Sequence, residues 1–146
     1  TVMIFDPKEQ EYEPADPRHF TGSARVARML GAATNPEINI YRVMFDARAR
    51  TAWHIHSGRQ LLVVLEGDCV LMRRSSGRLL NWERIPTGGV AVIPAGEEHS
   101  HGAPADTPMT HLAINVNATT EWLELVTDDE YLPLFNDVRS DGYRRI

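Results

Sequence analysis

The stretch Trp53-His54-Ile55-His56-Ser57-Gly58-Arg59-Gln60 carries the most informative pattern in the chain. Alternate residues of an extended chain share a face, so His54 and His56 point the same way. Gln60 joins them if the Ser57-Gly58 step does not flip the face. Two neutral imidazoles on one side of a strand are well placed to bind one divalent metal ion. The alternative is a pair of solvent-exposed strand histidines.

The residues that follow favour an interior position for this face. A strongly apolar strand, Leu61–Leu65, comes directly after Gln60. Two like-facing buried imidazoles without a shared ligand would leave polar nitrogens unsatisfied, which costs free energy. Metal binding is therefore the favoured interpretation of His54 and His56.

Short segments rich in β-branched and aromatic residues dominate the rest of the chain, separated by glycine and proline turns. We predict strands at 38–45, 61–65, 69–72, 79–85, 90–93 and 110–116. This spacing of about 8–12 residues indicates a sandwich or a barrel. Residues 23–30 are undecided between helix and strand, and Asn35-Pro36 marks a turn. Thr127 is expected to cap a short helix with Glu130 as its capping-box partner.

A length of 146 residues suits one domain. We expect an N-terminal arm and lead-in at 1–34, a barrel at 35–126, and a C-terminal helix and tail at 127–146.

Fifteen basic against twenty acidic residues give a net charge of −5, which argues against nucleic-acid binding. A single cysteine excludes Cys-rich zinc and iron–sulfur sites. With no apolar run long enough for a membrane and no secretory pattern, a soluble, cytoplasmic protein is expected.

A second histidine cluster follows another apolar strand. Val90–Ile93 leads through Pro94-Ala95-Gly96 to His99 and His101, which taken alone are as consistent with a polar loop. Together the two segments resemble the paired motifs of cupin domains, G-x5-H-x-H-x(3,4)-E-x6-G and G-x5-P-x-G-x2-H-x3-N. The matching positions are His54, His56, Gln60 and Gly67 in the first motif, and Gly88, Pro94, Gly96 and His99 in the second.

The resemblance spans about Ile38 to Val116 and is to small single-domain cupins of the cupin-2 type. It implies an all-β fold, a small antiparallel jelly-roll barrel (double-stranded β-helix), with one metal ion held by His54, His56, Gln60 and His99. Arg48 and Ala103 replace the motif's first glycine and its asparagine, which casts doubt on local turns but not on the metal.

Gln60 replaces the glutamate ligand of the motif. Three imidazoles and an amide leave the charge of a divalent ion uncompensated, which favours Lewis-acid chemistry over oxygen activation. Mn(II), Fe(II), Co(II), Ni(II) and Zn(II) would all fit such a site.

Residues 109–114 and 122–131 resemble a subgroup of bacterial cupins that includes manganese-dependent hydroxynitrile lyases, which also carry glutamine here. This resemblance implies Mn(II) and the cleavage of cyanohydrins such as mandelonitrile to an aldehyde and cyanide. By strand parity His111, Ala113 and Asn115 share a face. If that face is interior, His111 could be the general base; the alternative is a core histidine bonded to a neighbour.

The remaining candidates are weaker. The resemblance implies that Tyr41, Val43 and Thr51 lie near the pocket mouth and bind substrate, and Asn115, on the face of His111, is a further candidate. Tyr41 and Val43 also suit a plain core role. We interpret Trp53 as a packing residue and Cys69 as a small buried hydrophobe. His101 is placed beside the ligands or on the surface, and His19 on the polar surface.

Three functions compete. The first is a metal-dependent lyase acting on a small carbonyl-derived substrate, the second an Fe-dependent dioxygenase, and the third a non-enzymatic module that binds a small molecule. The cupin resemblance implies long exposed sheet edges and a homodimer or higher homo-oligomer. The short apolar arm Val2–Phe5 is expected to add to a sheet edge, of its own chain or of a partner. We expect the acidic charge on the arm and surface and a net positive interior that draws in small anions or polarised carbonyl compounds.

Overall fold

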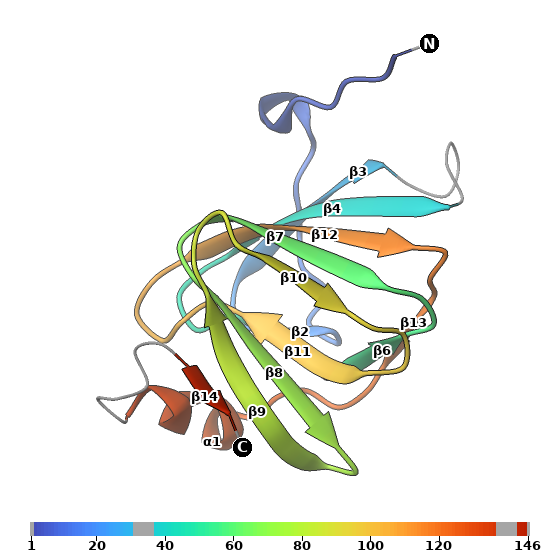
Figure 1. The fold of residues 1–146 in the computed structure, drawn as a ribbon. Helices are drawn as coiled ribbons and strands as arrows, with labels where there is room; N and C mark the ends of the chain where they lie inside the picture. The colour runs from blue at the N-terminus through green and yellow to red at the C-terminus, as the bar shows by residue number, and fades with distance from the viewer. Residues whose placement is uncertain (1, 31–36, 137–142, 146) are drawn as a thin grey trace.

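Two antiparallel sheets face each other in the computed structural model, which describes residues 2–30, 37–136 and 143–145 (Figure 1). The first sheet has the strand order β1-β3-β4-β12-β7-β10. Its strands are β1 (Glu13–Pro14), β3 (Ala24–Leu30), β4 (Ile38–Phe45), β7 (Gln60–Glu66), β10 (Val90–Ile93) and β12 (Met109–Val116).

The second sheet has the order β13-β6-β11-β8-β9-β14, with β2 and β5 joined beside β11. Its strands are β2 (Phe20–Thr21), β5 (Arg50–Thr51), β6 (His54–His56), β8 (Cys69–Ser75), β9 (Arg78–Ile85), β11 (Glu98–Gly102), β13 (Thr120–Trp122) and β14 (Tyr143–Arg145). Apart from β1-β3-β4 and the β8–β9 hairpin, the strands that neighbour one another are distant in sequence, as in a jelly roll.

The predicted all-β class is confirmed, and β4 and β10 begin and end where the sequence placed them. Residues 24–30, which the pattern left open between helix and strand, form β3, which pairs antiparallel with β4 from Ala24 opposite Phe45 to Leu30 opposite Ile40. Strands β1, β2, β5, β11, β13 and β14 were not predicted; most are two or three residues long and lack a run of β-branched side chains. The turn expected at Asn35-Pro36 lies outside the described residues.

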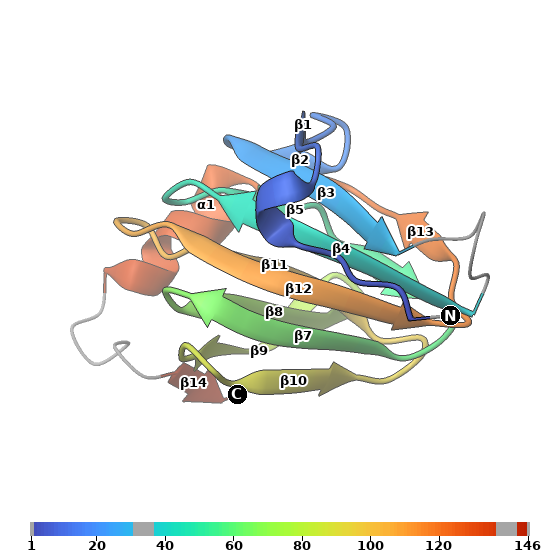
Figure 2. The ribbon, with the colours of Figure 1, turned by 90° about the horizontal axis from the view of Figure 1, so that it is seen from above.

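The arm Val2–Phe5 pairs with neither sheet of its own chain, and its side chains are exposed. It precedes a short 3-10 helix, η1 (Pro7–Glu9). Figure 2 shows this dark-blue segment crossing in front of β3 and β4. No helix in the described part of the chain is long and apolar enough to cross a membrane.

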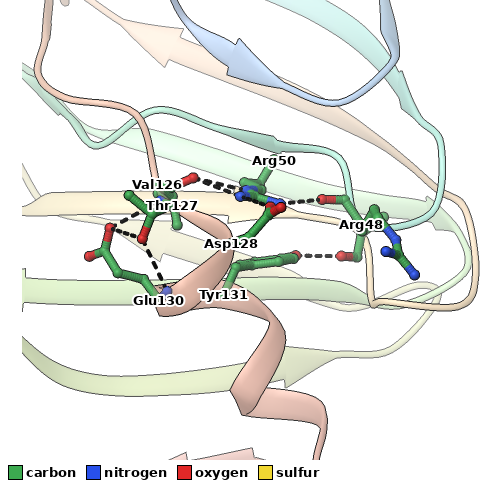
Figure 3. Close-up of polar contacts among 8 residues, drawn as sticks. Arg48, Arg50, Val126, Thr127, Asp128, Glu130 and Tyr131 are labelled. Carbon is green, nitrogen blue, oxygen red and sulfur yellow. Dashed lines mark hydrogen bonds and ion pairs between the residues drawn. The ribbon is translucent and has the colours of Figure 1, made fainter.

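The predicted C-terminal helix is present as α1 (Asp128–Tyr131), followed by the 3-10 helix η2 (Leu132–Phe135). Thr127 and Glu130 form the expected capping box. The buried Arg50 guanidinium ties this end to the barrel by donating to the Val126 carbonyl and to the Asp128 carboxylate (Figure 3). Tyr131 lies under the same guanidinium, 4.8 Å from ring centroid to Cζ.

Cross-strand register brings the candidate residues together in pairs. His54 on β6 lies opposite His99 on β11, and Gln60 on β7 lies opposite Asn115 on β12. On the other side of β12, His111 faces Val43 on β4. Directly opposed residues have close Cβ atoms, so the register alone gathers residues that are 45 (His54 and His99), 55 (Gln60 and Asn115) and 68 (Val43 and His111) positions apart.

Candidate metal centre

His54, His56 and His99 form a buried triad between the two sheets. One ring nitrogen from each lies within 4.8 Å of the other two, and all three side chains are buried. Strand parity explains the first pair, because β6 alternates buried, half-buried and buried residues. His99 joins them through its cross-strand pairing with His54.

Hydrogen bonds fix which nitrogen each ring presents. Nδ1 of His54 lies 2.8 Å from the Ala52 carbonyl, and Nδ1 of His99 lies 2.8 Å from the Glu97 carbonyl. A carbonyl can only accept, so both Nδ1 atoms carry the proton and both Nε2 atoms expose a lone pair. His56 bonds Thr120 through Nδ1, and its buried Nε2 has no hydrogen-bond partner in the described structure.

The contact between His99 and Gln60 fits a cation. Gln60 donates from Nε2 to Oδ1 of Asn115 across 2.8 Å, which turns its Oε1 toward the triad. That oxygen lies 3.0 Å from Nε2 of His99. Because Nδ1 of His99 already carries the proton, the lone pair on Nε2 of His99 faces a lone pair on Oε1 of Gln60. A positive ion bound to both atoms removes this repulsion. Three imidazole nitrogens and one amide oxygen therefore fit a divalent transition metal.

Burial keeps these rings neutral, as metal binding requires. Desolvation lowers the pKa of His54 well below its usual value, and the neighbouring His99 lowers it further. Desolvation also lowers the pKa of His56, and it brings the pKa of His99 to about 4. The lone pairs are available at neutral pH without loss of a proton.

Two motif positions show how the turns around the site are built. Gly67 has φ of 68°, and a Cβ there would lie 2.3 Å from the Pro108 carbonyl oxygen, so only glycine fits. Arg48 stands where the motif has its first glycine and has φ of 64°. The chain thus keeps the left-handed turn before the triad without the glycine, and the doubt about this turn is resolved.

A cavity of about 230 Å³ opens beside the triad. All of the residues expected to bind substrate line it, together with the expected base: Tyr41, Val43, Thr51, Asn115 and His111. Thr51 also accepts a hydrogen bond from the backbone N–H of His101. The volume lies below the ~300–1,000 Å³ usual for drug-sized ligands, so it suits a small molecule.

His101, expected either beside the ligands or on the surface, lies beside them in the cavity wall. It is buried, lies 5.2 Å from His54 between ring centroids, and its Nδ1 is 2.9 Å from Nε2 of His111. Nε2 of His101 and Nδ1 of His111 have no hydrogen-bond partner among the described residues. His99-Ser100-His101 is a second His-x-His on an extended segment, so strand parity was the signal that could have found it.

His19 is not a lone surface residue. Its ring stacks on Trp122 at 4.2 Å between centroids with 6° between planes, and Trp122 lines the cavity. Trp53 packs in the core as expected, at 2% exposure. Cys69 is fully buried, and burial raises the pKa of its thiol to about 12, which excludes a nucleophilic role at neutral pH.

The side chains that line the cavity do not supply the net positive charge expected there. The cavity lining contains no lysine, arginine or acidic residue, and burial lowers the pKa of its central histidines. A net positive charge in the cavity would therefore come from a bound ion. The acidic charge does lie on the N-terminal segment, as expected.

Comparisons with known proteins agree with this architecture. The cupin domain model matches residues 41–115. The chain is 39% identical over 121 residues to an (R)-mandelonitrile lyase of Granulicella tundricola, covering 81% of this chain and 88% of that one. A cupin-like protein from Thermotoga maritima superposes with a TM-score of 0.75 and 29% identity, covering 88% of this chain and 96% of that one. A polyketide cyclase from Streptomyces resistomycificus shares the fold, with a TM-score of 0.70, 15% identity, and coverage of 96% and 98%. The chain belongs to the cupin family.

Proposed function

We propose that this protein is a metal-dependent lyase that cleaves small cyanohydrins to an aldehyde or ketone and hydrogen cyanide. The observation that carries the proposal is the donor set of His54, His56, His99 and Gln60 beside a small cavity. The 39% identity to an (R)-mandelonitrile lyase supports the choice of substrate. Mn(II) is the proposed ion, and the neutral donor set is compatible with Fe(II), Co(II), Ni(II) or Zn(II).

A bound divalent ion would supply Lewis-acid stabilisation of negative charge on an oxygen or on cyanide. The protein supplies the rest. Asn115 orients Gln60, and the carbonyls of Ala52 and Glu97 fix the tautomers of His54 and His99. Such outer contacts hold the donor atoms in place before substrate arrives.

The His101–His111 pair is the proposed proton acceptor. The two rings share one hydrogen bond of 2.9 Å, so one unbonded nitrogen of the pair keeps a lone pair, either Nε2 of His101 or Nδ1 of His111. Removal of the hydroxyl proton lets the carbonyl form as the C–CN bond breaks and its electron pair leaves with cyanide. The His101–His111 pair then returns the proton to cyanide. Desolvation lowers the pKa of His111 to about 4, so it is unprotonated at the start of the cycle.

The direct test measures benzaldehyde release from mandelonitrile by the metal-loaded protein, together with metal content. The wild type is expected to turn over and to hold one ion per chain. His54→Ala loses the ion and the activity, whereas His19→Gln, outside the triad, keeps the ion. His111→Ala keeps the ion but loses activity. Turnover that survives His54→Ala would overturn the proposal.

Two other functions are distinguished by the same preparation. Oxygen uptake by the Fe(II)-loaded protein with a phenolic or enol substrate would favour a dioxygenase. Tight metal binding with neither cyanohydrin cleavage nor oxygen uptake would favour a module that only binds a small molecule.

We further propose that the chain forms a homodimer or a higher homo-oligomer. Val2 and Ile4 are 84% and 86% exposed, and Val90 and Val92 on β10 are 56% and 60% exposed. β10 ends its sheet, so its outer edge can accept an added strand. Light scattering is expected to give at least twice the chain mass, and Val2→Asp with Ile4→Asp is expected to lower it; a wild-type monomer would contradict this.

A further inference from the structure

A second hollow, here called the acidic groove, adjoins the cavity. It encloses about 790 Å³ between the N-terminal segment of residues 9–16 and strands β3 and β4. Phe20, Val26 and Tyr41 line both the groove and the cavity, so the two meet at these side chains. In Figure 2 the N-terminal segment lies in front of β3 and β4, and β1 within this segment pairs with β3.

The charged residues of the acidic groove are mostly of one sign. Its lining includes Glu9, Glu11, Glu13 and Asp16 against a single basic residue, Arg28. Arg28 bonds Oδ1 of Asn39. Asp16 is offset by Arg18, which holds the pKa of that carboxyl near 2.

The carboxylates of Glu9, Glu11 and Glu13 therefore make the charge of the groove negative. None of the ion pairs formed within the described part of the chain includes Glu9, Glu11 or Glu13. Charges that line a concave surface act together on an approaching molecule, because the low-dielectric walls focus their field. Within a Debye length of about 8 Å at physiological salt, this field repels anions.

The cavity next to the groove has unpartnered polar atoms that a ligand can meet, but none of its side chains is a lysine or arginine that would attract an anion. Nε2 of His56 and Nε2 of His101 are buried and unpartnered among the described residues, and both rings line the cavity. Unsatisfied buried nitrogens cost free energy until a ligand, an ion or water meets them. The cavity lining itself carries no arginine or lysine.

We infer that the acidic groove is the route by which small molecules reach the cavity, and that Glu9, Glu11 and Glu13 select against anions on that route. The substrate is then an uncharged or cationic small molecule; this statement about substrate rests on the proposed function. Small carboxylates and dicarboxylates are disfavoured, even though a bound divalent ion would attract them from inside the cavity.

Fluorescence quenching tests the route without any turnover or metal. Trp53 and Trp82 are each 2% exposed, so Trp122, on the cavity wall, is the tryptophan that a quencher can reach. Quenching by iodide, caesium and neutral acrylamide is measured at low salt, normalised to the unfolded chain, with Trp122→Phe as background. The wild type is expected to show iodide quenching several-fold below caesium quenching, and added salt should bring the two together.

The decisive variant combines Glu9→Gln, Glu11→Gln and Glu13→Gln. It is expected to raise iodide quenching several-fold and to leave acrylamide quenching unchanged. The matched control combines Glu66→Gln, Asp106→Asn and Asp129→Asn, which removes the same charge from exposed positions outside the groove. Equal effects of the two triple variants, or no effect of the first, would overturn the inference.

A second experiment tests whether the groove affects catalysis. The groove variant is expected to raise kcat/KM several-fold for a mandelonitrile that carries a ring carboxylate and to leave the value for mandelonitrile itself unchanged. If no cyanohydrin is cleaved, the proposed function fails while the quenching result still decides the role of the groove. If cleavage occurs and the groove variant does not raise kcat/KM for the anionic substrate, the groove is not the route.

Discussion

Gln60 and Asn115 lie opposite each other on β7 and β12, and Nε2 of Gln60 donates to Oδ1 of Asn115 across 2.8 Å. This bond decides which end of the Gln60 amide faces the triad. Without it the amide could turn its N–H groups toward the lone pairs of His99 and His56, which would compete with a metal ion. Asn115, which the sequence analysis placed in the substrate pocket, thus also orients a metal donor.

Asn115→Ala is expected to weaken metal affinity by about 10- to 100-fold, the usual effect of losing an outer contact to a ligand. Competition with a chelator measures this affinity directly. Asn115→Asp keeps an acceptor for Nε2 of Gln60 and is the matched control, with affinity equal to or above that of the wild type. Equal affinity of the alanine variant and the wild type would show that Gln60 does not bind the ion.

Gln60→Glu is expected to tighten metal binding and to make oxidation of a bound Fe(II) or Mn(II) easier, because a carboxylate offsets part of the ion's charge. The measurement is the reduction potential of the iron-loaded protein, which falls in the variant. A potential that stays the same in the variant would contradict coordination by residue 60.

The metal-free protein is expected to lose stability in mild acid. Desolvation lowers the pKa values of His99 and His111 from 6.5 to about 4 in the folded chain. The unfolded chain therefore takes up protons first, so the stability that these two groups contribute is complete above about pH 6.5 and is lost as the pH falls toward 4. The slope is about 1.4 kcal/mol per pH unit for each group.

Urea unfolding between pH 7 and 4 measures this dependence. His111→Leu removes one titrating group, so the slope of unfolding free energy against pH falls by up to about 1.4 kcal/mol per pH unit. A free energy of unfolding that stays constant down to pH 5 would show that these rings are not desolvated in the folded protein.

The sequence predicted the triad because its information is local: alternation on a strand pairs His54 with His56, and motif spacing selects His99. It left His101 open between a position beside the ligands and the surface, because β11 is a polar strand whose extended conformation depends on pairing with β8 and β6. It also could not place the acidic groove. The charge of residues 9–16 is evident from sequence, but their position across β3 and β4 is a tertiary contact with no local signal.

Arg50→Met is expected to cost about 3 kcal/mol. The guanidinium donates to the carbonyls of Val126 and Arg48, and buried acceptors left without a donor cost about 1–3 kcal/mol each. Asp128→Asn is expected to cost less than about 1 kcal/mol, because that carboxylate is 70% exposed and its ion pair is solvent-screened. Denaturant midpoints compare the two variants. A larger loss for Asp128→Asn would mean that the ion pair, and not the carbonyl contacts, holds the C-terminal helix.

Arg48→Gly is expected to leave stability unchanged or to raise it by up to about 1 kcal/mol. A non-glycine residue in the left-handed region costs about 1–2 kcal/mol, which glycine avoids. Glycine in turn loses about 1 kcal/mol more conformational entropy on folding, because its unfolded chain is more flexible. The Arg48 side chain offers little in compensation, since its hydrogen bond within the described structure, to the Ala105 carbonyl, is 3.4 Å long and exposed. Arg48→Val, β-branched at φ of 64°, is expected to lose more than about 1 kcal/mol. Urea midpoints at constant m-value measure both, and a destabilised glycine variant would mean that the arginine itself supports the turn before the triad.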